Sequence, residues 1–172
     1  MSGGPAKTKR VVIIGMGDTG VLVASRLSRD FQVTGISTKP NLVSGQELGK
    51  RLADLDWWQR FYNTPLHRFK ALSRVEICHA KATSVDVDNQ TVTVVDQSKL
   101  ETRIPYDFLI IASGTSNGFW RDDSLRSEAD IDAQLQSDAR AISEARSIAI
   151  VGGGPCGVSS ALNIQRAYPD KS

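Results

Sequence analysis

The spacing of apolar residues changes several times along the chain, and each spacing predicts a different element. Val11-Val12-Ile13-Ile14 is a continuous β-branched run, typical of a strand buried on both faces of a parallel sheet. Apolar residues then recur with helical spacing at Val21, Ala24 and Leu27, and residues 31–36 predict a second strand. The first 36 residues therefore predict a strand, a loop, a helix and a strand.

The middle of the chain predicts two helices followed by a region of short strands. Residues 47–60 and 66–72 have helical spacing. From Val75 onward apolar and polar residues alternate, with a turn signal at Asp88-Asn89. This alternation predicts a small antiparallel meander that starts at Val75 and closes near residues 104–105.

The last third of the chain repeats the opening pattern. Residues 108–112 predict an apolar strand, and residues 131–142 carry apolar positions on one face of a helix. Residues 147–151 predict a further buried strand, which runs through a glycine-rich loop into a helix over residues 158–168. A unit of strand, glycine loop and helix therefore occurs twice.

Both loops carry the pattern GxGxxG. The first glycine loop is Gly15–Gly20, and the second glycine loop is Gly152–Gly157. In this pattern the first glycine makes the tight turn and the second lets the backbone approach a pyrophosphate. The third glycine packs the helix against the strand, and the helix N-terminus attracts negative charge. Because each copy lies between an apolar strand and a helix, the sequence predicts two dinucleotide-binding loops.

Composition excludes several other classes of protein. The chain has 172 residues, of which 40% are hydrophobic and 23% are charged, so it can bury a core. A net charge of +2 does not indicate nucleic-acid binding, and no apolar run has the length of a membrane span. Cys78 and Cys156 lie far apart and His67 and His79 have no partners at ligand spacing, so we expect neither a disulfide framework nor a metal site.

The end of the second predicted strand lacks the acidic residue that usually binds a nucleotide ribose. Ser37 stands at that position, and it could still form one hydrogen bond to a ribose hydroxyl. Thr38 and Lys39 follow, so a ribose that carries a phosphate would also be tolerated.

The order of these features resembles the flavoproteins with two dinucleotide-binding domains, the pyridine nucleotide-disulfide oxidoreductase superfamily. The segment Ile111–Thr115, at the end of the predicted strand, is similar to the second FAD motif of that family, with Ser113 in place of the usual threonine. Within the family, the chain is most similar to enzymes of the apoptosis-inducing-factor-like and type II NADH:quinone-oxidoreductase-like branch. The resemblance covers residues 10–172, about the first half of a family member.

The resemblance implies an α/β fold: a Rossmann-like FAD-binding domain with an inserted β-meander, followed by the start of a second Rossmann-like NAD(P)-binding domain. The expected boundaries are a disordered tail over 1–9, the FAD-binding domain over 10–115, a connecting segment with a helix over 116–145, and the partial NAD(P)-binding domain over 146–172. The residues implied for FAD are Gly15, Gly17, Asp18, Thr19, Gly20, Ser37, Lys39, Lys50 or Arg51, Lys81, Ala82, Ala112, Ser113 and Gly114. Those implied for NAD(P)H are Gly152, Gly153, Gly154, Pro155, Cys156 and Gly157.

The activity implied by the resemblance is FAD-dependent oxidation of NAD(P)H, with electrons passed to a quinone-like or other acceptor. No residue is implied as a catalytic acid or base, because the cofactors carry the chemistry. The family's glutamate two residues after the second glycine loop is replaced by Ser159, so the alternative is a nucleotide-binding fragment or paralogue without turnover. We expect a protein without a transmembrane segment that is cytoplasmic or peripheral to a membrane face.

Overall fold

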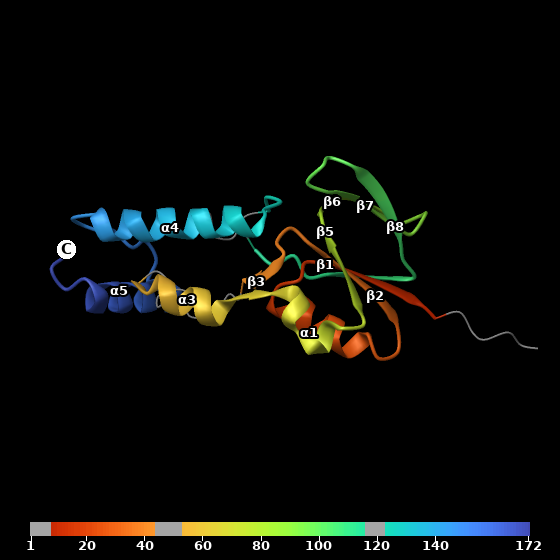
Figure 1. The fold of residues 1–172 in the computed structure, drawn as a ribbon, viewed down its shortest axis with the longest axis horizontal. Coiled ribbons are helices and arrows are strands. Elements are labelled where there is room, and N and C mark those ends of the chain that lie inside the picture. Colours follow the sequence, from red (N-terminus) through yellow and green to blue (C-terminus); the bar gives the residue numbers. More distant parts are fainter. Residues whose placement is uncertain (1–7, 44–52, 116–122) are drawn as a thin grey trace, which may run out of the picture. The chain divides into compact units, whose positions relative to one another are not determined.

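The computed structural model describes residues 8–43, 53–115 and 123–172, which belong to two compact units. The first unit comprises Met1–Leu42 and Pro65–Arg126, and the second comprises Val43–Thr64 and Ser127–Ser172. The chain passes between the units in β3 (Asn41–Val43), in β4 (Asn63–Pro65) and after Arg126 (Figure 1).

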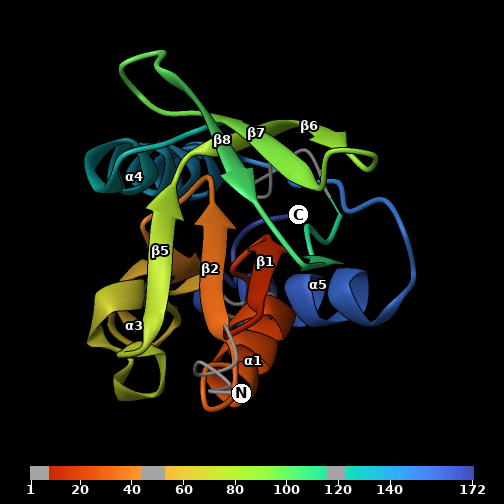
Figure 2. The same cartoon turned by 90° about the vertical axis from the view of Figure 1, so that its right-hand side faces the viewer.

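A parallel sheet of four strands forms the centre of the first unit. Its order is β5-β2-β1-β9, and the strands are β1 (Arg10–Ile14), β2 (Gln32–Ser37), β5 (Val75–His79) and β9 (Phe108–Ile111). Every pairing in this sheet is parallel, and Figure 2 shows β1, β2 and β5 running in the same direction. This sheet and its crossovers confirm the predicted α/β fold.

Helical segments cover one face of this sheet. They are α1 (Asp18–Leu27) and two 3₁₀ turns, η1 (Leu66–Arg68) and η2 (Lys70–Leu72). The core on this face consists of Val11, Ile13, Met16, Ala24, Val33, Leu66 and Leu72.

The antiparallel meander covers the opposite face. It consists of β6 (Lys81–Asp86), β7 (Thr91–Val95) and β8 (Glu101–Pro105), in the order β6-β7-β8. The core on this face consists of Val12, Ile36, Ala80, Val92, Val94 and Tyr106. Consecutive residues of β1 face opposite layers, which explains why the sequence of this strand is apolar without interruption.

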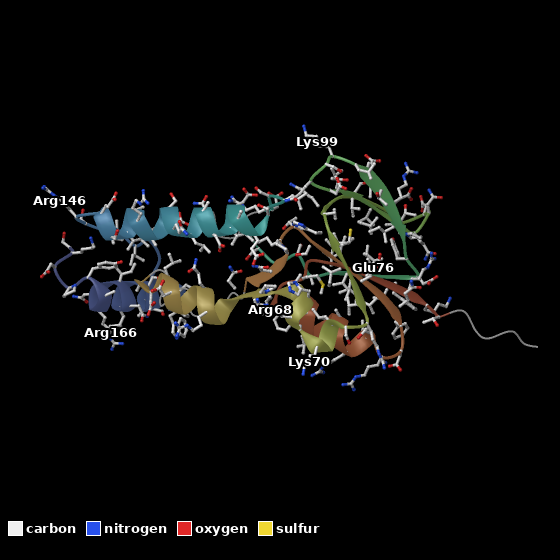
Figure 3. The ribbon with its side chains drawn as sticks, in the orientation of Figure 1. Arg68, Lys70, Glu76, Lys99, Arg146 and Arg166 are labelled. Carbon is white, nitrogen blue, oxygen red and sulfur yellow. The ribbon has the colours of Figure 1, made fainter. Side chains whose placement is uncertain are left out.

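Two predictions for this unit are wrong in detail. The strand at Val75–His79 does not open the meander but pairs with β2 in the parallel sheet, where Thr34 Oγ1 donates to Glu76 Oε2 at 3.2 Å. Figure 3 labels Glu76 on this strand. Its alternating sequence is that of an edge strand with one exposed side, which periodicity alone cannot distinguish from a meander strand. The helix predicted over 66–72 is two 3₁₀ turns, because Phe69 between them has an extended backbone.

Helices make up most of the second unit. They are α3 (Leu55–Tyr62), α4 (Glu128–Glu144) and α5 (Pro155–Ala167). Part of the helix predicted over 47–60 lies outside the described residues, and the described part is interrupted at Asp54, whose side chain caps α3 by accepting from the Trp57 amide at 3.0 Å. Lys171 Nζ donates to the carbonyls of Ser143 and Ala145 at 2.7 and 2.6 Å, at the C-terminal end of α4, where a positive charge is favourable. Within the described ranges, no helix is both long and apolar enough to cross a membrane.

Asp107 joins the first strand to the segment that leads into β9. Its Oδ2 accepts from the backbone amide of Arg10 at 2.6 Å and from Nε of the same residue at 3.3 Å. These hydrogen bonds, the backbone one first, lower the pKa of the Asp107 carboxyl below its ordinary value.

A pH-dependent contribution to stability follows from this lowered pKa. Because the folded protein favours the ionised form, the contribution is complete above the ordinary carboxyl pKa and is lost as the pH falls through the lowered value. We expect Asp107→Asn to lower the urea midpoint at neutral pH. The difference from the native chain should shrink as the pH is taken below about 5. A difference that is the same at every pH would contradict the ionic origin of this contribution.

Candidate nucleotide-binding site

All the parallel strands of the first unit end at the same edge of the sheet, which is where doubly wound folds bind ligands. The first glycine loop follows β1, Ser37 ends β2, and residues 112–114 follow β9. The fold therefore brings three segments that the sequence implied for FAD to one edge.

Gly15 makes the turn at this edge and touches the second implied FAD motif. It has φ +99°, and a Cβ built on it would lie 2.5 Å from the carbonyl oxygen of Ala112 and 2.8 Å from Cα of Ser113. Its amide donates to Ile36 O at 2.8 Å, so the turn is fixed against β2 as well. A side chain at Gly15 would therefore push the loop away from β9, and the structure explains why glycine stands there.

The other two glycines of the first loop have different roles. A Cβ on Gly20 would overlap the carbonyl oxygen of Gly15, so the loop can close onto α1 only with glycine at this position. A Cβ on Gly17 would meet nothing within 4 Å, and the backbone there is extended, so the space in front of it is open. The Val21 amide donates to the carbonyl of Gly17 at 2.9 Å, so α1 begins at this loop, and the N-terminus of a helix is where an anion would bind.

The hydroxyl of Ser37 is held in a local turn. It donates to the carbonyl of Lys39 at 2.7 Å and accepts from the Lys39 amide at 3.2 Å, and the residue is buried. A hydroxyl has one proton, so in this state Ser37 can only accept a further hydrogen bond. At the position where an acidic residue usually binds the ribose, the Ser37 hydroxyl therefore stabilises the turn after β2.

Lys81 and Ala82 open β6 beside this edge, where the resemblance places the adenine. The pairing of β6 with β7 shifts by one residue between Ala82 and Ser84, which marks a β-bulge. Lys81 Nζ forms an ion pair with Asp123 Oδ2 at 2.7 Å. The implied residues Lys50 and Arg51 lie outside the described residues.

The second glycine loop repeats the backbone geometry of the first. Gly152 has φ +110°, a Cβ on Gly157 would overlap the carbonyl oxygen of Gly152, and Gly154 faces open space. Gly154 precedes the helix with φ −76°, against −78° for Gly17 at the same place. A Cβ on Gly153 would also meet nothing within 4 Å. Pro155 occupies the first turn of α5, where proline is favoured, and Cys156 is exposed.

The predicted strand before the second glycine loop is not formed. Residues 147–151 do not form a strand, and Val151 is 99% exposed. A strand needs a paired neighbour, and among the described residues Ser172 is the one that pairs with this segment: Ile148 donates to Ser172 O at 2.8 Å, and Ser172 donates to Arg146 O at 3.4 Å. The hydrogen bond from the Ser172 amide to the Arg146 carbonyl corresponds to the one from the Gln32 amide to the Lys9 carbonyl. The segments that lead into the two glycine loops therefore share this hydrogen bond.

The other reactive side chains that the structure describes include a cysteine, the potential metal ligands and a histidine. The pKa of the Cys78 thiol is raised by burial and, to a smaller extent, by Glu76 and Asp96, so the thiolate is disfavoured. No group of three or more metal-binding side chains occurs among residues 8–43, 53–115 and 123–172. The sequence shows no partner for His79 at ligand spacing, whereas in the structure its ring contacts the carbonyl groups of Thr38 and Arg126. In the sequence, the only signal for this contact is the position of His79 at the end of an apolar segment, two residues before Lys81.

Two glycine loops of this geometry, each at the start of a helix, are typical of dinucleotide-binding proteins. The family model for pyridine nucleotide-disulphide oxidoreductases matches residues 9–168, and the chain belongs to this family.

The chain is also similar to individual members of known identity. It is 26% identical over 166 residues to apoptosis-inducing factor homolog A of Dictyostelium discoideum, covering 95% of this chain and 38% of that protein. It is 32% identical over 111 residues to sulfide-quinone reductase of Aquifex aeolicus, covering 62% of this chain and 24% of that one. The solved structure of a water-forming NADH oxidase from Lactobacillus brevis superimposes with a TM-score of 0.67 at 21% identity, over 95% of this chain and 38% of the other. The chain thus spans less than two-fifths of the length of each.

Proposed function

We propose that this chain is the nucleotide-binding part of an FAD-dependent NAD(P)H oxidoreductase, with FAD on the first glycine loop and NAD(P)H on the second. The observation that carries the proposal is the repeated loop geometry, with an open second glycine in front of a helix N-terminus in both copies. A pyrophosphate needs backbone amides, positive potential and the absence of a Cβ, and each loop provides all three.

The residues of the first loop would hold and orient the nucleotide. The amides at the start of α1 would bind the pyrophosphate, while Ala112, Ser113 and Gly114 would run beside it as the chain leaves the sheet. Gly114 has φ +69° and an open Cβ position, so the backbone there can also approach a ligand closely. When bound, the flavin and the nicotinamide supply the hydride-transfer chemistry, and the protein supplies their positions.

The acceptor proposed for the electrons is a quinone-like molecule. The sulfide-quinone reductase is named for such an acceptor, and it is 32% identical to this chain over 111 residues.

The proposal is tested by the visible absorption of the purified chain after reconstitution with FAD, followed by anaerobic addition of NADH or NADPH. We expect a bound flavin spectrum, which the reduced nicotinamide then bleaches. A soluble quinone should restore the oxidised spectrum. A chain that binds FAD but is not bleached would favour the non-catalytic alternative, and one that never binds FAD would overturn both.

A further inference from the structure

A short segment of the first unit, Asp123–Arg126, crosses the ends of two parallel strands; we call it the crossing segment. The Arg126 amide donates to the carbonyl of Thr38, just after β2, at 2.9 Å. Lys81 Nζ, at the start of β6, forms the ion pair with Asp123. The crossing segment is therefore attached on both sides of the edge where β2 and β5 end.

His79, the last residue of β5, connects the crossing segment to the turn after β2. Its Nε2 lies 3.0 Å from the carbonyl oxygen of Arg126 and 3.4 Å from that of Thr38. Both oxygens are acceptors only, so Nε2 must carry the proton and donate. The ring is partly buried and its neighbour in the sheet is Ser37, the residue at the expected ribose position.

Different parts of a dinucleotide would lie at different positions along this edge of the sheet. The first glycine loop lies after β1, where the pyrophosphate would bind. Ser37 ends β2, His79 ends β5, and Lys81 follows two residues later at the start of β6. A dinucleotide whose pyrophosphate is on the glycine loop extends its adenosine along this edge toward β2.

We propose that the crossing segment is a wall of the adenosine half of the first nucleotide site, and that His79 is the positioning residue that holds it there. This inference rests on the proposed binding of FAD to the first glycine loop. His79 acts through the backbone of Thr38 and Arg126, both of which it holds by hydrogen bonds to carbonyl groups. A preformed wall favours binding because the ligand does not have to order the segment itself.

The test compares His79→Leu, which removes the donor, with His79→Gln, which keeps an N–H at the end of a similar side chain. His67→Leu is the matched control, because His67 is an exposed histidine in η1 and belongs to none of these contacts. Two quantities are measured: hydrogen exchange at the Arg126 amide without nucleotide, and the dissociation constants of FAD, AMP and FMN by fluorescence or calorimetry.

We expect His79→Leu to speed exchange at the Arg126 amide and to weaken FAD and AMP by about five- to tenfold, the effect of one lost hydrogen bond. Binding of FMN, which has no adenosine, and the shape of the bound flavin spectrum should not change. His79→Gln should restore both quantities, and His67→Leu should match the native chain.

Unchanged FAD and AMP affinity in His79→Leu, or failure of His79→Gln to restore them, would overturn the inference while leaving the proposed function in place. A native chain that binds no FAD would instead overturn the proposed function, and the wall with it. Circular dichroism of each variant ensures that a loss of binding is not a loss of fold.

Discussion

Gly20→Ala is expected to destabilise the first unit by about 3 kcal/mol or more, because the new methyl group would overlap a backbone atom that cannot move alone. The atom is the carbonyl oxygen of Gly15, whose position is set by the positive φ of that residue and by the bond from its amide to Ile36. Relief requires α1 to move away from β1, which opens the core that contains Ala24 and Val11. Urea unfolding followed by circular dichroism measures this loss.

Gly17→Ala is the matched control for this prediction, because it adds the same methyl group three residues earlier. Its Cβ meets nothing within 4 Å and its φ of −78° suits alanine, so only a weaker helix cap is expected, at a cost of about 1 kcal/mol or less. If Gly20→Ala lowered the free energy of unfolding no more than Gly17→Ala does, the third glycine would not be required for packing.

The parts of the fold that the sequence predicts well are those whose pattern has one cause. β1 is apolar from Val11 to Ile14 because it is buried on both faces, and the glycines that follow it are explained by a tight turn, an open approach and close packing of α1. The end of the meander and the helices α1, α4 and α5 follow from alternation and from helical spacing in the same way. These elements are decided locally, so local reasoning finds them.

The errors occur where pairing partners decide the structure. Val75–His79 alternates like a meander strand but pairs with β2. Residues 147–151 are mostly apolar, like β1, but no strand of the described ranges lies beside them. At Asp54, a side chain that accepts from the Trp57 amide begins a new helix where periodicity predicts a continuous one. In each case the sequence of the segment itself is compatible with two outcomes.

In the candidate site, too, local features could be predicted from the sequence and long-range contacts could not. The glycines can be predicted because their roles are short-range, and the structure explains them residue by residue. The contact of His79 with Arg126 joins residues 47 positions apart, and no spacing rule predicts it. The role of the Ser37 hydroxyl, held by Lys39, also becomes visible only once the turn after β2 is in place.

Gly17→Val is expected to weaken FAD binding by about a hundredfold or more while the unit stays folded. The valine side chain would enter the open space in front of the start of α1, which is where the pyrophosphate must approach the backbone amides. Loss of two charge-assisted hydrogen bonds, at about 1.5–3 kcal/mol each, accounts for an effect of this size. Titration of flavin fluorescence measures the affinity, and the urea midpoint measures the fold.

Gly154→Val is the matched control, because it makes the same change at the equivalent position of the second glycine loop, where the Cβ position is also open. It should leave FAD affinity unchanged and weaken NAD(P)H instead, since the two loops lie in different units. If Gly154→Val were the variant that lost FAD, the assignment of the two nucleotides would have to be exchanged. If both variants kept both nucleotides, the open glycines would not be approached by a pyrophosphate at all.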